Sequence, residues 1–575
     1  MSLLATLSEY FSRAEVEHLA EELSRYHRIQ GSPGLEEAGR YIRDALVDWG
    51  LDVRVYDLPY GAESPPTSAP IVGWFVVDGF AELVKPKRKV ISSLKQAWTA
   101  VVAHSPPGEF EGRVCYAPTY SHVAHCRDSV VLTSDWGFGT YVKAAEAGAR
   151  AIIAYRKNAP PSSYPYFGIF PTKSDLDYLK IPALTTPREV AEEIIGSMEK
   201  GEEVVVRGYV KSGYRDEAYA RVIEASAGPG NTREEYHLVA HYCHPGATVN
   251  DNVSGSVGVL SAARSLSLAA REGRLSLRRN VKFVLVPEHH GTARYLRKAL
   301  SEERRIAGAV DLDMVGEKQC RTGSTLLLVR SPILLLNHLE ASVYLKLLSA
   351  IPKSTSFSTP AEFPLLRFSV VNYETGSDHD VYVSLGIPAV MLNQWPDKYY
   401  HTSSDTLDKM SPRLVFSIGV AALSAVLELD EARVEPYFHM VYGLDAARVS
   451  GTVLSARQHL YWRKSRELGV DAGIKSVEPP HGGDLLKLAV DGYVTPLYLR
   501  YRIGVRAVDR IRELSDKFKY STTALAIAGI YLREGVKNSE RLRFEVSGEL
   551  GVEVPKETFD ELMNLAEEAG YVARV

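Results

Sequence analysis

Histidine and carboxylate side chains recur where apolar, strand-like runs of this sequence end. Four such runs end in this way: HLVAH, VKFVLVPEHH, AGAVDLD and GIPAVMLNQW with the loop that follows it. The residues at or just beyond these ends are, in chain order, His241, Asp251, Glu288, His289, Asp313 and His401. A largely parallel α/β sheet binds ligands outside the carboxyl ends of its strands. The spacing therefore predicts that these side chains meet at one edge of a sheet.

These residue types suit a hydrolytic centre with two metal ions. Such a centre needs two sets of terminal ligands, one carboxylate that bridges both ions, and one unligated carboxylate that deprotonates a water. Imidazole and carboxylate ligands fit zinc or a neighbouring first-row metal. The sequence therefore predicts two Zn²⁺ ions per chain, with Co²⁺ or Mn²⁺ as alternatives.

Each residue also has a purely structural interpretation when it is taken alone. Asp251 could belong to a turn and helix cap before Ser254. Glu288 could open a helix, where the helix dipole favours a carboxylate, and His401 could cap a turn. Asp313 is harder to explain in this way, because carboxylates are rarely buried without a partner. The conjunction of all of them at strand ends favours the metal centre.

Composition limits the classes of protein that the chain can represent. At 575 residues it exceeds the roughly 250–300 residues at which single cores stop growing, so we expect several domains. The 67 basic and 71 acidic residues are nearly balanced, which argues against bulk nucleic-acid binding. Four scattered cysteines do not predict a disulfide framework. With a charged amphipathic N-terminus and no apolar run of about 20 residues, we expect no membrane span and a cytoplasmic location.

The alternation of apolar strands and amphipathic helices predicts the fold class. It is typical of a mixed, mostly parallel sheet flanked by helices. We expect an N-terminal part of the core with linker strands over 1–107, an inserted β-rich domain over 108–210, the catalytic core over 211–430 and a mainly helical domain over 431–575. The last of these vaguely suggests a winged helix, but a packing or dimerisation domain is favoured because no Lys/Arg-rich stripe accompanies it.

As a set, the motifs AHYC, DNVSG, EHHG, DMVG and HTSSDT resemble the zinc-dependent aminopeptidase family that includes bacterial leucyl aminopeptidases and glutamate carboxypeptidase II. The resemblance implies that His241 and Asp313 bind one metal ion, that Asp251 bridges, and that His401 binds the other ion. It makes Glu288 the general base. Residues 108–210 are similar to the protease-associated domain inserted in glutamate carboxypeptidase II.

Two positions depart from the family pattern. His289 stands where the family has a glutamate ligand; histidine can bind the same metal, and His290 is an adjacent alternative. Cys243 replaces an aspartate that orients the first histidine, and cysteine is a weaker acceptor. His244 is therefore either a substitute ligand or a loop residue. Asp378, in the segment SDHDVYVSLGIPAVML, lies in a region that also resembles the family and is a further candidate for a supporting role.

The predicted function is a metal-dependent exopeptidase, and an aminopeptidase in particular, with a peptide as its substrate. Two alternatives stay open: a metal-binding scaffold that has lost activity, and an amidohydrolase or cyclising acyltransferase that acts on a non-peptide amide. No membrane or nucleic-acid partner is expected. A homo-oligomer formed through the C-terminal domain is a further expectation.

Overall fold

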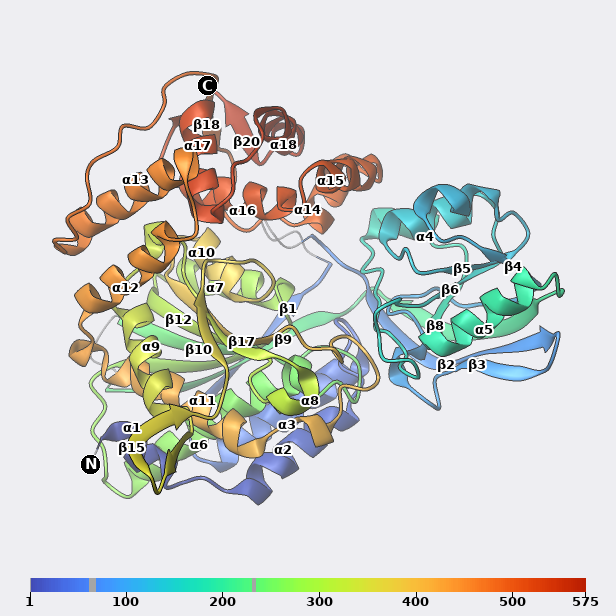
Figure 1. Cartoon of the computed structure of the whole chain (residues 1–575). Coiled ribbons are helices and arrows are strands. Elements are labelled where there is room, and N and C mark those ends of the chain that lie inside the picture. Colours follow the sequence, from blue (N-terminus) through green and yellow to red (C-terminus); the bar gives the residue numbers. More distant parts are fainter. Residues whose placement is uncertain (1, 62–68, 230–233) are drawn as a thin grey trace.

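An eight-stranded sheet forms the centre of the molecule (Figure 1). The computed structural model describes residues 2–61, 69–229 and 234–575. The strand order is β1-β9-β11-β10-β12-β17-β13-β16, and the four central strands β11, β10, β12 and β17 are parallel. The strands are β1 (Asp52–Pro59), β9 (Tyr219–Ala227), β10 (Glu234–His241), β11 (Asn280–Val286), β12 (Arg305–Asp313), β13 (Thr325–Val329), β16 (Phe368–Val371) and β17 (Ala389–Trp395). The predicted α/β class is confirmed.

The central strands are buried on both faces. In β10, Leu238 and Ala240 belong to one hydrophobic core and Val239 belongs to the other. Phe283 and Val284 of β11 divide in the same way, because successive side chains of a strand point to opposite faces. A strand covered on both sides reads as a continuous apolar run, so the sequence locates these strands well.

In the described part of the chain, six helices cover one face of the sheet. They are α1 (Leu3–Ser8), α2 (Arg13–Arg25), α3 (Pro33–Asp48), α6 (Gly255–Arg271), α9 (His338–Ala350) and α11 (Pro412–Leu427). Ser12, Ser32 and Ser411 precede three of them, and each hydroxyl accepts a hydrogen bond from the backbone N–H three residues on. These bonds satisfy helix N–H groups that would otherwise lack a partner.

Within the described residues, the helical stretch from Asn250 to Arg271 is alone in being long and apolar enough, by length and composition, to cross a membrane. Its most apolar window is 83% buried inside the structure. It includes α6, which packs between the sheet and α11 and is thus a core helix.

A second sheet is inserted between β1 and β9 and lies beside the core (Figure 1). Its order is β3-β2-β8-β4-β5-β6-β7, and helices α4 and α5 accompany it. The elements are β2 (Gly73–Lys85), β3 (Lys89–Ser93), β4 (Gly108–Tyr116), β5 (Val130–Thr133), α4 (Phe138–Glu146), β6 (Ala151–Ala154), β7 (Ala183–Thr185), α5 (Arg188–Glu199) and β8 (Val205–Arg215). We refer to residues 73–215 as the insert.

The boundary predicted at 108 is wrong, because β2 and β3 belong to the sheet of the insert. β2 pairs along its length with β8, which follows it by more than a hundred residues in the chain. Strand propensity is local, so it does not reveal which sheet a strand joins. Residues 62–68 of the predicted linker lie outside the described residues. The likeness of the insert to a protease-associated domain stays a prediction.

The insert also carries a disulfide between Cys115 and Cys126. The scattered cysteines did not predict it, because the pairing depends on β4 and a following loop that meet only in the fold. Cys243 and Cys320 are free. Disulfides persist mainly in oxidising compartments, so this one does not support the predicted cytoplasmic location.

The C-terminal region packs on the other face of the central sheet. Its helices share a hydrophobic core with sheet residues such as Val239 and with α7 (His290–Ser301) and α10 (His379–Ser384). It contains α12 (Val434–Ala446), α13 (Gly451–Leu468), α14 (Pro496–Ile503), α15 (Arg506–Lys517), α16 (Ser521–Leu532), α17 (Ser539–Leu550) and α18 (Lys556–Glu568). A small sheet, β19-β18-β20, joins Leu485–Leu488 with Lys537–Asn538 and Val572–Arg574. The region is mainly helical, as predicted.

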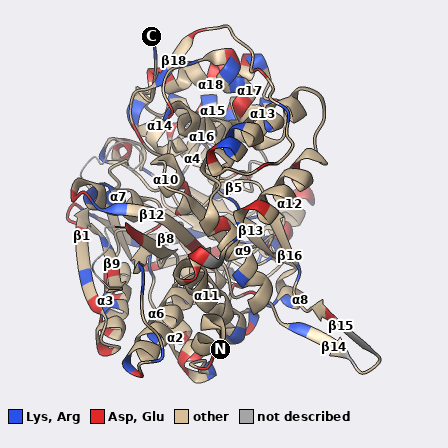
Figure 2. Ribbon diagram, turned by 90° about the vertical axis from the view of Figure 1, so that its left-hand side faces the viewer, with Lys and Arg blue, Asp and Glu red and all other residues tan. Residues whose placement is uncertain are grey.

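Basic and acidic side chains are interspersed on the C-terminal helices (Figure 2). Arg506 and Arg510 of α15 both pair with Glu568 of α18, and Lys517 pairs with Glu561. These cations are therefore neutralised by carboxylates of a neighbouring helix. A hairpin of β14 (Lys353–Ser356) and β15 (Thr359–Pro364) extends away from the body of the molecule (Figure 2).

Candidate metal centre

The candidate residues gather at one edge of the central sheet. β10 ends at His241, which lies level with Val286 of β11, and Glu288 follows two residues later. β12 ends at Asp313, which lies level with Asn393 of β17. These strands are parallel, so their carboxyl ends meet at the same edge, as the sequence predicts.

Asp251 lies between two groups of ligand-type side chains. Its Oδ1 atom is 3.6 Å from His241 Nε2, which is 3.5 Å from Asp313 Oδ1. Its Oδ2 atom is 2.9 Å from His401 Nε2 and 3.5 Å from His244 Nε2. Two triads result, His241–Asp251–Asp313 and His244–Asp251–His401, and they share one carboxylate. This is the arrangement of a bridged two-metal site.

The ligand atoms of these triads face one another. Asp251 Oδ2, Asp313 Oδ1 and His401 Nε2 are buried, and the charged neighbours that lie within 4 Å of them are other members of the triads. Such a buried group of carboxylates and imidazoles needs charge compensation. Imidazole nitrogens and carboxylate oxygens grouped within coordination reach are the ligands that zinc takes in proteins. The residues therefore fit a pair of divalent metal ions.

Asp405 holds the loop that carries Asp251. Its carboxylate accepts hydrogen bonds from the backbone N–H groups of Asn250 (2.9 Å) and Asp251 (3.1 Å). Asn252 fixes the other side of the loop, since its side chain donates to Leu312 O. Burial raises the pKa of Asp405 to about 8. Asp405 was not predicted to have a role, although the motif HTSSDT contains it.

Comparison with known proteins identifies the core. The model of peptidase family M28 matches residues 222–426, which include all residues of both triads. This part of the chain belongs to peptidase family M28. The zinc-exopeptidase resemblance found in the sequence is thereby confirmed. No curated protein matches the chain.

Solved structures share the fold of the M28 domain and of further parts of the chain. A putative peptidase from Clostridium acetobutylicum is 12% identical, and the match covers 100% of this chain and 98% of that one with a TM-score of 0.51. BSAP, a zinc aminopeptidase from Bacillus subtilis, is 17% identical over 73% of this chain and 95% of its own, also with a TM-score of 0.51. A peptidase M28 precursor from Shewanella amazonensis is 18% identical over 72% and 97%, with the same TM-score. At these identities the likeness concerns the fold alone.

His289 does not reach the metal centre of the M28 domain, so its prediction as a ligand is wrong. Its Nε2 atom lies 3.0 Å from Ser377 O and 3.8 Å from Asp380 Oδ2, and its ring lies against Tyr493. Burial opposes its protonation, but Asp380 and Glu288 outweigh this and raise the pKa of His289 to about 10.

His244 occupies the place left by His289. It comes three residues after His241 on the loop that follows β10, and its backbone has a φ of 112°. Residues other than glycine rarely adopt this conformation, and such residues cluster at functional sites. Spacing along the chain did not distinguish His244 from a loop residue, because only the turn of the backbone brings its ring to Asp251.

Asp378 and His290 also lie outside both triads. Asp378 Oδ1 accepts hydrogen bonds from His289 N (2.8 Å) and Thr292 Oγ1 (2.5 Å), so it holds the turn between β11 and α7. His290 begins α7, and its ring lies against Tyr60. This position does not support His290 as an alternative ligand. For Asp378 the sequence predicts a supporting role, and its two hydrogen bonds are to the turn that follows Glu288.

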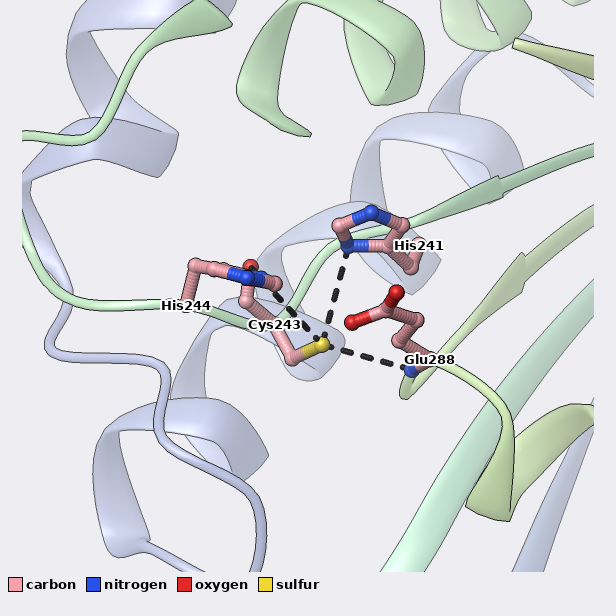
Figure 3. Close-up of side chains that lie close together, drawn as sticks. All are labelled: His241, Cys243, His244 and Glu288. Atoms are coloured by element: carbon pink, nitrogen blue, oxygen red, sulfur yellow. Dashed lines mark hydrogen bonds between the residues drawn. The ribbon is translucent and has the colours of Figure 1, made fainter. Parts of the chain in front are cut away.

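Cys243 lies behind the two histidines (Figure 3). Its sulfur is 3.6 Å from His241 Nδ1 and 3.7 Å from His244 Nδ1, and it accepts a hydrogen bond from Glu288 N at 3.3 Å. Burial raises the pKa of the Cys243 thiol, so it stays protonated near neutral pH. It therefore orients both rings from the side opposite Asp251, which is the supporting position predicted for it.

The carboxylate of Glu288 points toward His241 and Cys243 (Figure 3). Burial raises its pKa to about 7. Glu288 lines a cavity of about 320 Å³ together with His244 and His401. The opposite wall of this cavity consists mainly of insert residues, with Gln30 and Cys243 of the core. The insert residues are Trp136, Gly137, Arg156, Tyr166, Phe167, Gly168 and Phe170.

The insert loop over this cavity is bonded directly to the loop that carries His401. Tyr166 N donates to His401 O at 2.7 Å, and Ser403 N donates to Tyr164 O at 2.8 Å. The Tyr166 ring also packs edge-on against His401, with centroids 4.9 Å apart. The sequence does not predict a role for Tyr166, because the order of residues along the chain does not link the insert to His401.

Proposed function

We propose that the chain is a metal-dependent exopeptidase that hydrolyses short peptides with Glu288 as general base. The observation that carries the proposal is the pair of triads sharing Asp251, with the Glu288 carboxylate facing the same cavity. The match of residues 222–426 to peptidase family M28 supports a peptide as the substrate.

His241, Asp313 and Asp251 would hold one metal ion, and His244, His401 and Asp251 would hold the other. When bound, two zinc ions lower the pKa of a water and polarise the scissile carbonyl. Besides Asp251, the second set contains the imidazoles of His244 and His401, whereas the resemblance implies one glutamate and one imidazole. That set has one negative charge fewer, and imidazole suits zinc. Zinc is therefore the proposed metal.

Glu288 would remove a proton from the attacking water and deliver it to the leaving amine. A base works best when its pKa lies near the operating pH, and burial brings the pKa of Glu288 to about 7. The turn that carries Glu288 is fixed at both ends, since its N–H bonds to Cys243 Sγ and its carbonyl accepts from Gln30 Nε2 at 3.0 Å. The carboxylate is thus positioned before substrate arrives.

The Tyr166 phenol could donate a hydrogen bond to the oxygen of the reacting carbonyl, because Tyr166 lines the cavity together with Glu288. Burial raises the pKa of Tyr166 well above its ordinary value, and the neighbouring Cys243, Glu288 and Asp251 add to the effect. The phenol therefore stays protonated, and a neutral hydroxyl near developing negative charge stabilises it.

The enclosure of the centre favours cleavage at a chain end. The C-terminal region reaches the insert across a neighbouring cavity of about 400 Å³ that Glu288 also lines. Arg500 of α14 donates to Phe170 O at 2.8 Å and pairs with Asp175 at 3.1 Å. Because parts of the insert, the core and the C-terminal region border these cavities, we propose that they receive the end of a short peptide. The sequence predicts aminopeptidase action. Short peptides with free or blocked ends test this form of exopeptidase activity.

We expect that removing metal abolishes peptide hydrolysis. The full chain is stripped with a chelator, reloaded with zinc, cobalt or manganese, and assayed on short peptides with free or blocked ends. Because the ions supply the acidity of the attacking water, activity should fall at least about 100-fold on stripping and return with two equivalents of metal. Mass spectrometry of bound metal gives the stoichiometry.

Each alternative function has its own outcome in this assay. Cleavage of no peptide by protein that holds two ions would contradict the peptidase proposal and favour the inactive scaffold. Cleavage only of acylated small molecules would instead favour an amidohydrolase or acyltransferase. Blocking the amino end separates aminopeptidase action from action at the carboxyl end.

A pair of histidine variants tests the composition of the second triad. We expect His244→Ala to lower the metal content from two ions to about one, because it removes one of three protein ligands of that ion. Activity should fall about 100-fold or more, since loss of even a supporting group costs 10–100-fold. His289→Ala should keep both ions, because its ring contacts Ser377 and Asp380 and neither triad. Loss of metal in His289→Ala with retention in His244→Ala would contradict the assignment.

A further inference from the structure

A further group of ligand-type side chains surrounds Cys243, behind the two triads. The ligand atoms of His241, Cys243, His244 and Glu288 all lie within 4.8 Å of one another. Both imidazole rings and the Glu288 carboxylate lie around the Cys243 sulfur (Figure 3). The group shares its two histidines with the triads, but it adds a thiol and the proposed base. We refer to these four residues as the cysteine site.

The spacing around the sulfur fits one tetrahedral zinc ion. Zn–S bonds of about 2.3 Å and Zn–N bonds of about 2.0–2.1 Å place the sulfur and a nitrogen of a tetrahedral site about 3.6 Å apart. Cys243 Sγ lies 3.6 Å from His241 Nδ1 and 3.7 Å from His244 Nδ1. Imidazole, thiolate and carboxylate are all zinc ligands, and four protein ligands fill its coordination sphere. The cysteine site therefore matches a closed zinc site, with no position left for water or substrate.

One divalent ion at the cysteine site is compensated in charge and has a route of entry. A thiolate at Cys243 and the carboxylate of Glu288 together balance two positive charges, and a buried ion needs such compensation. Cys243 is only 2% exposed, but it lines the cavity of about 320 Å³ together with His244 and Glu288. An ion enters through this cavity, and the thiol proton that it displaces leaves to solvent by the same route.

The cysteine site and the triads use opposite nitrogens of the same two rings. His241 Nε2 lies 3.6 Å from Asp251 Oδ1, and His244 Nε2 lies 3.5 Å from Asp251 Oδ2, whereas both Nδ1 atoms face Cys243. A neutral imidazole has one nitrogen with a free lone pair, because the other carries the proton. Each ring therefore binds a metal ion on one side only.

A hydrogen bond of His244 accompanies this choice. When its Nε2 atom binds a metal ion, the proton is on Nδ1, and Cys243 O can accept it at 3.0 Å. Binding at the cysteine site replaces this hydrogen bond by a bond from Nδ1 to the ion and moves the proton to Nε2. Occupation of the cysteine site and occupation of the two triads are thus mutually exclusive.

We propose that a single ion with affinity for thiolate, such as zinc or cobalt, binds at the cysteine site when metal is scarce and keeps the centre inactive. The inference rests on the proposed function and adds metal-dependent regulation of the same centre. Glu288 is then a ligand instead of a base. A second ion reverses the state, because the triads offer three ligand groups to each of two ions. Cys243 then regains its proton, and Glu288 is released.

The test is a titration of the metal-free full chain with cobalt, because a thiolate ligand gives Co²⁺ a charge-transfer band in the near ultraviolet. The band should grow up to one equivalent of cobalt and fall between one and two equivalents. Hydrolysis of a short peptide at one equivalent should stay below about one tenth of the rate at two, because a closed site has no position for water. Manganese should give no such delay, since thiolate ligands do not favour it.

Two serine variants separate the cysteine site from other thiols. Cys243→Ser should lack the band, and hydrolysis should begin with the first equivalent of cobalt. Its affinity for the first ion should fall at least about tenfold, since loss of even a supporting group costs 10–100-fold. Cys320→Ser is the matched control, because Cys320 is the other free cysteine and is exposed. This variant should keep both the band and the delay. Thermal unfolding of each variant confirms that it is folded.

A third variant tests the mutual exclusion. Asp313 belongs to one triad and not to the cysteine site. Asp313→Asn should therefore form the band at one equivalent of cobalt as the unaltered chain does. It should keep more of the band at two equivalents, because its two-metal state is weakened. Loss of the band at one equivalent in this variant would contradict separate ligand sets.

The outcomes distinguish this inference from the proposed function. Absence of the band from the unaltered chain at every cobalt level, or its presence in Cys243→Ser, would overturn the cysteine site. A band that keeps its full strength at two equivalents would overturn the mutual exclusion and the inactive state with it. If the band rises and falls but no peptide is cleaved, the peptidase proposal fails and the cysteine site stands. If peptides are cleaved without any band, the cysteine site fails alone.

Discussion

Replacing Asp251 with asparagine is expected to empty both halves of the metal centre. One oxygen of Asp251 faces His241 and the other faces His401 and His244, so this single side chain serves both triads. Asparagine removes the negative charge and turns one of the two oxygens into an N–H donor that cannot bind a cation. Bound metal should fall from two ions to fewer than one per chain.

The activity of Asp251→Asn should fall by about 10,000-fold or more, because both the acidity of the water and the polarisation of the carbonyl are lost. Metal analysis by mass spectrometry and kcat/KM on the best peptide measure the two effects. Asp313→Asn is the matched control: Asp313 belongs to one triad, so this variant should lose one ion and keep the other. Retention of both ions by Asp251→Asn would refute a bridging role.

Glu288→Gln is expected to leave the metal centre intact and to lower kcat by about 1,000-fold, within the range that a general base contributes. Glutamine has the shape of glutamate but cannot take a proton at its amide. Glu288 belongs to neither triad, and the hydrogen bonds of its backbone to Cys243 and Gln30 do not involve the carboxylate. The two bound ions and the value of KM should therefore change little.

Single-turnover kinetics with metal analysis measure this effect directly. Glu288→Asp keeps the carboxylate but shortens the side chain, so it should retain more activity than the glutamine variant. If Glu288→Gln turns over at the rate of the unaltered chain with both ions bound, the base is another residue. If it loses metal, Glu288 is a ligand and the two triads are incompletely described.

The strands of the core were predictable because they are buried on both faces. Leu238, Val239 and Ala240 are apolar in succession, since each of the two faces of β10 packs against helices. The ends of such runs can be recognised in the sequence, and the candidate ligands and base lie at or just beyond these ends: His241, Asp251, Glu288, Asp313 and His401. Their approach to one edge follows from parallel pairing, which the alternation of strands and helices implies.

Several features could not be predicted because they depend on contacts between distant segments. The sequence predicts a start of the insert at 108, because local pattern does not reveal that β2 pairs with β8. The bond between Tyr166 N and His401 O likewise arises where two loops that are distant in the chain meet. Asp405 supports Asp251 from a position more than 150 residues later in the chain.

The choice between His244 and His289 shows most clearly what the sequence determines and what the tertiary structure determines. By itself, the sequence determined the ligand chemistry, the order of the motifs and the expectation of two metal ions, because residue type and strand-end position are local properties. Only the tertiary structure decided which histidine completes the second triad. The backbone turn at His244 directs that ring to Asp251, whereas Ser377, Asp378 and Asp380 hold His289 away from it. Side-chain direction at a turn depends on the surrounding packing and hydrogen bonds, and motif spacing does not encode these.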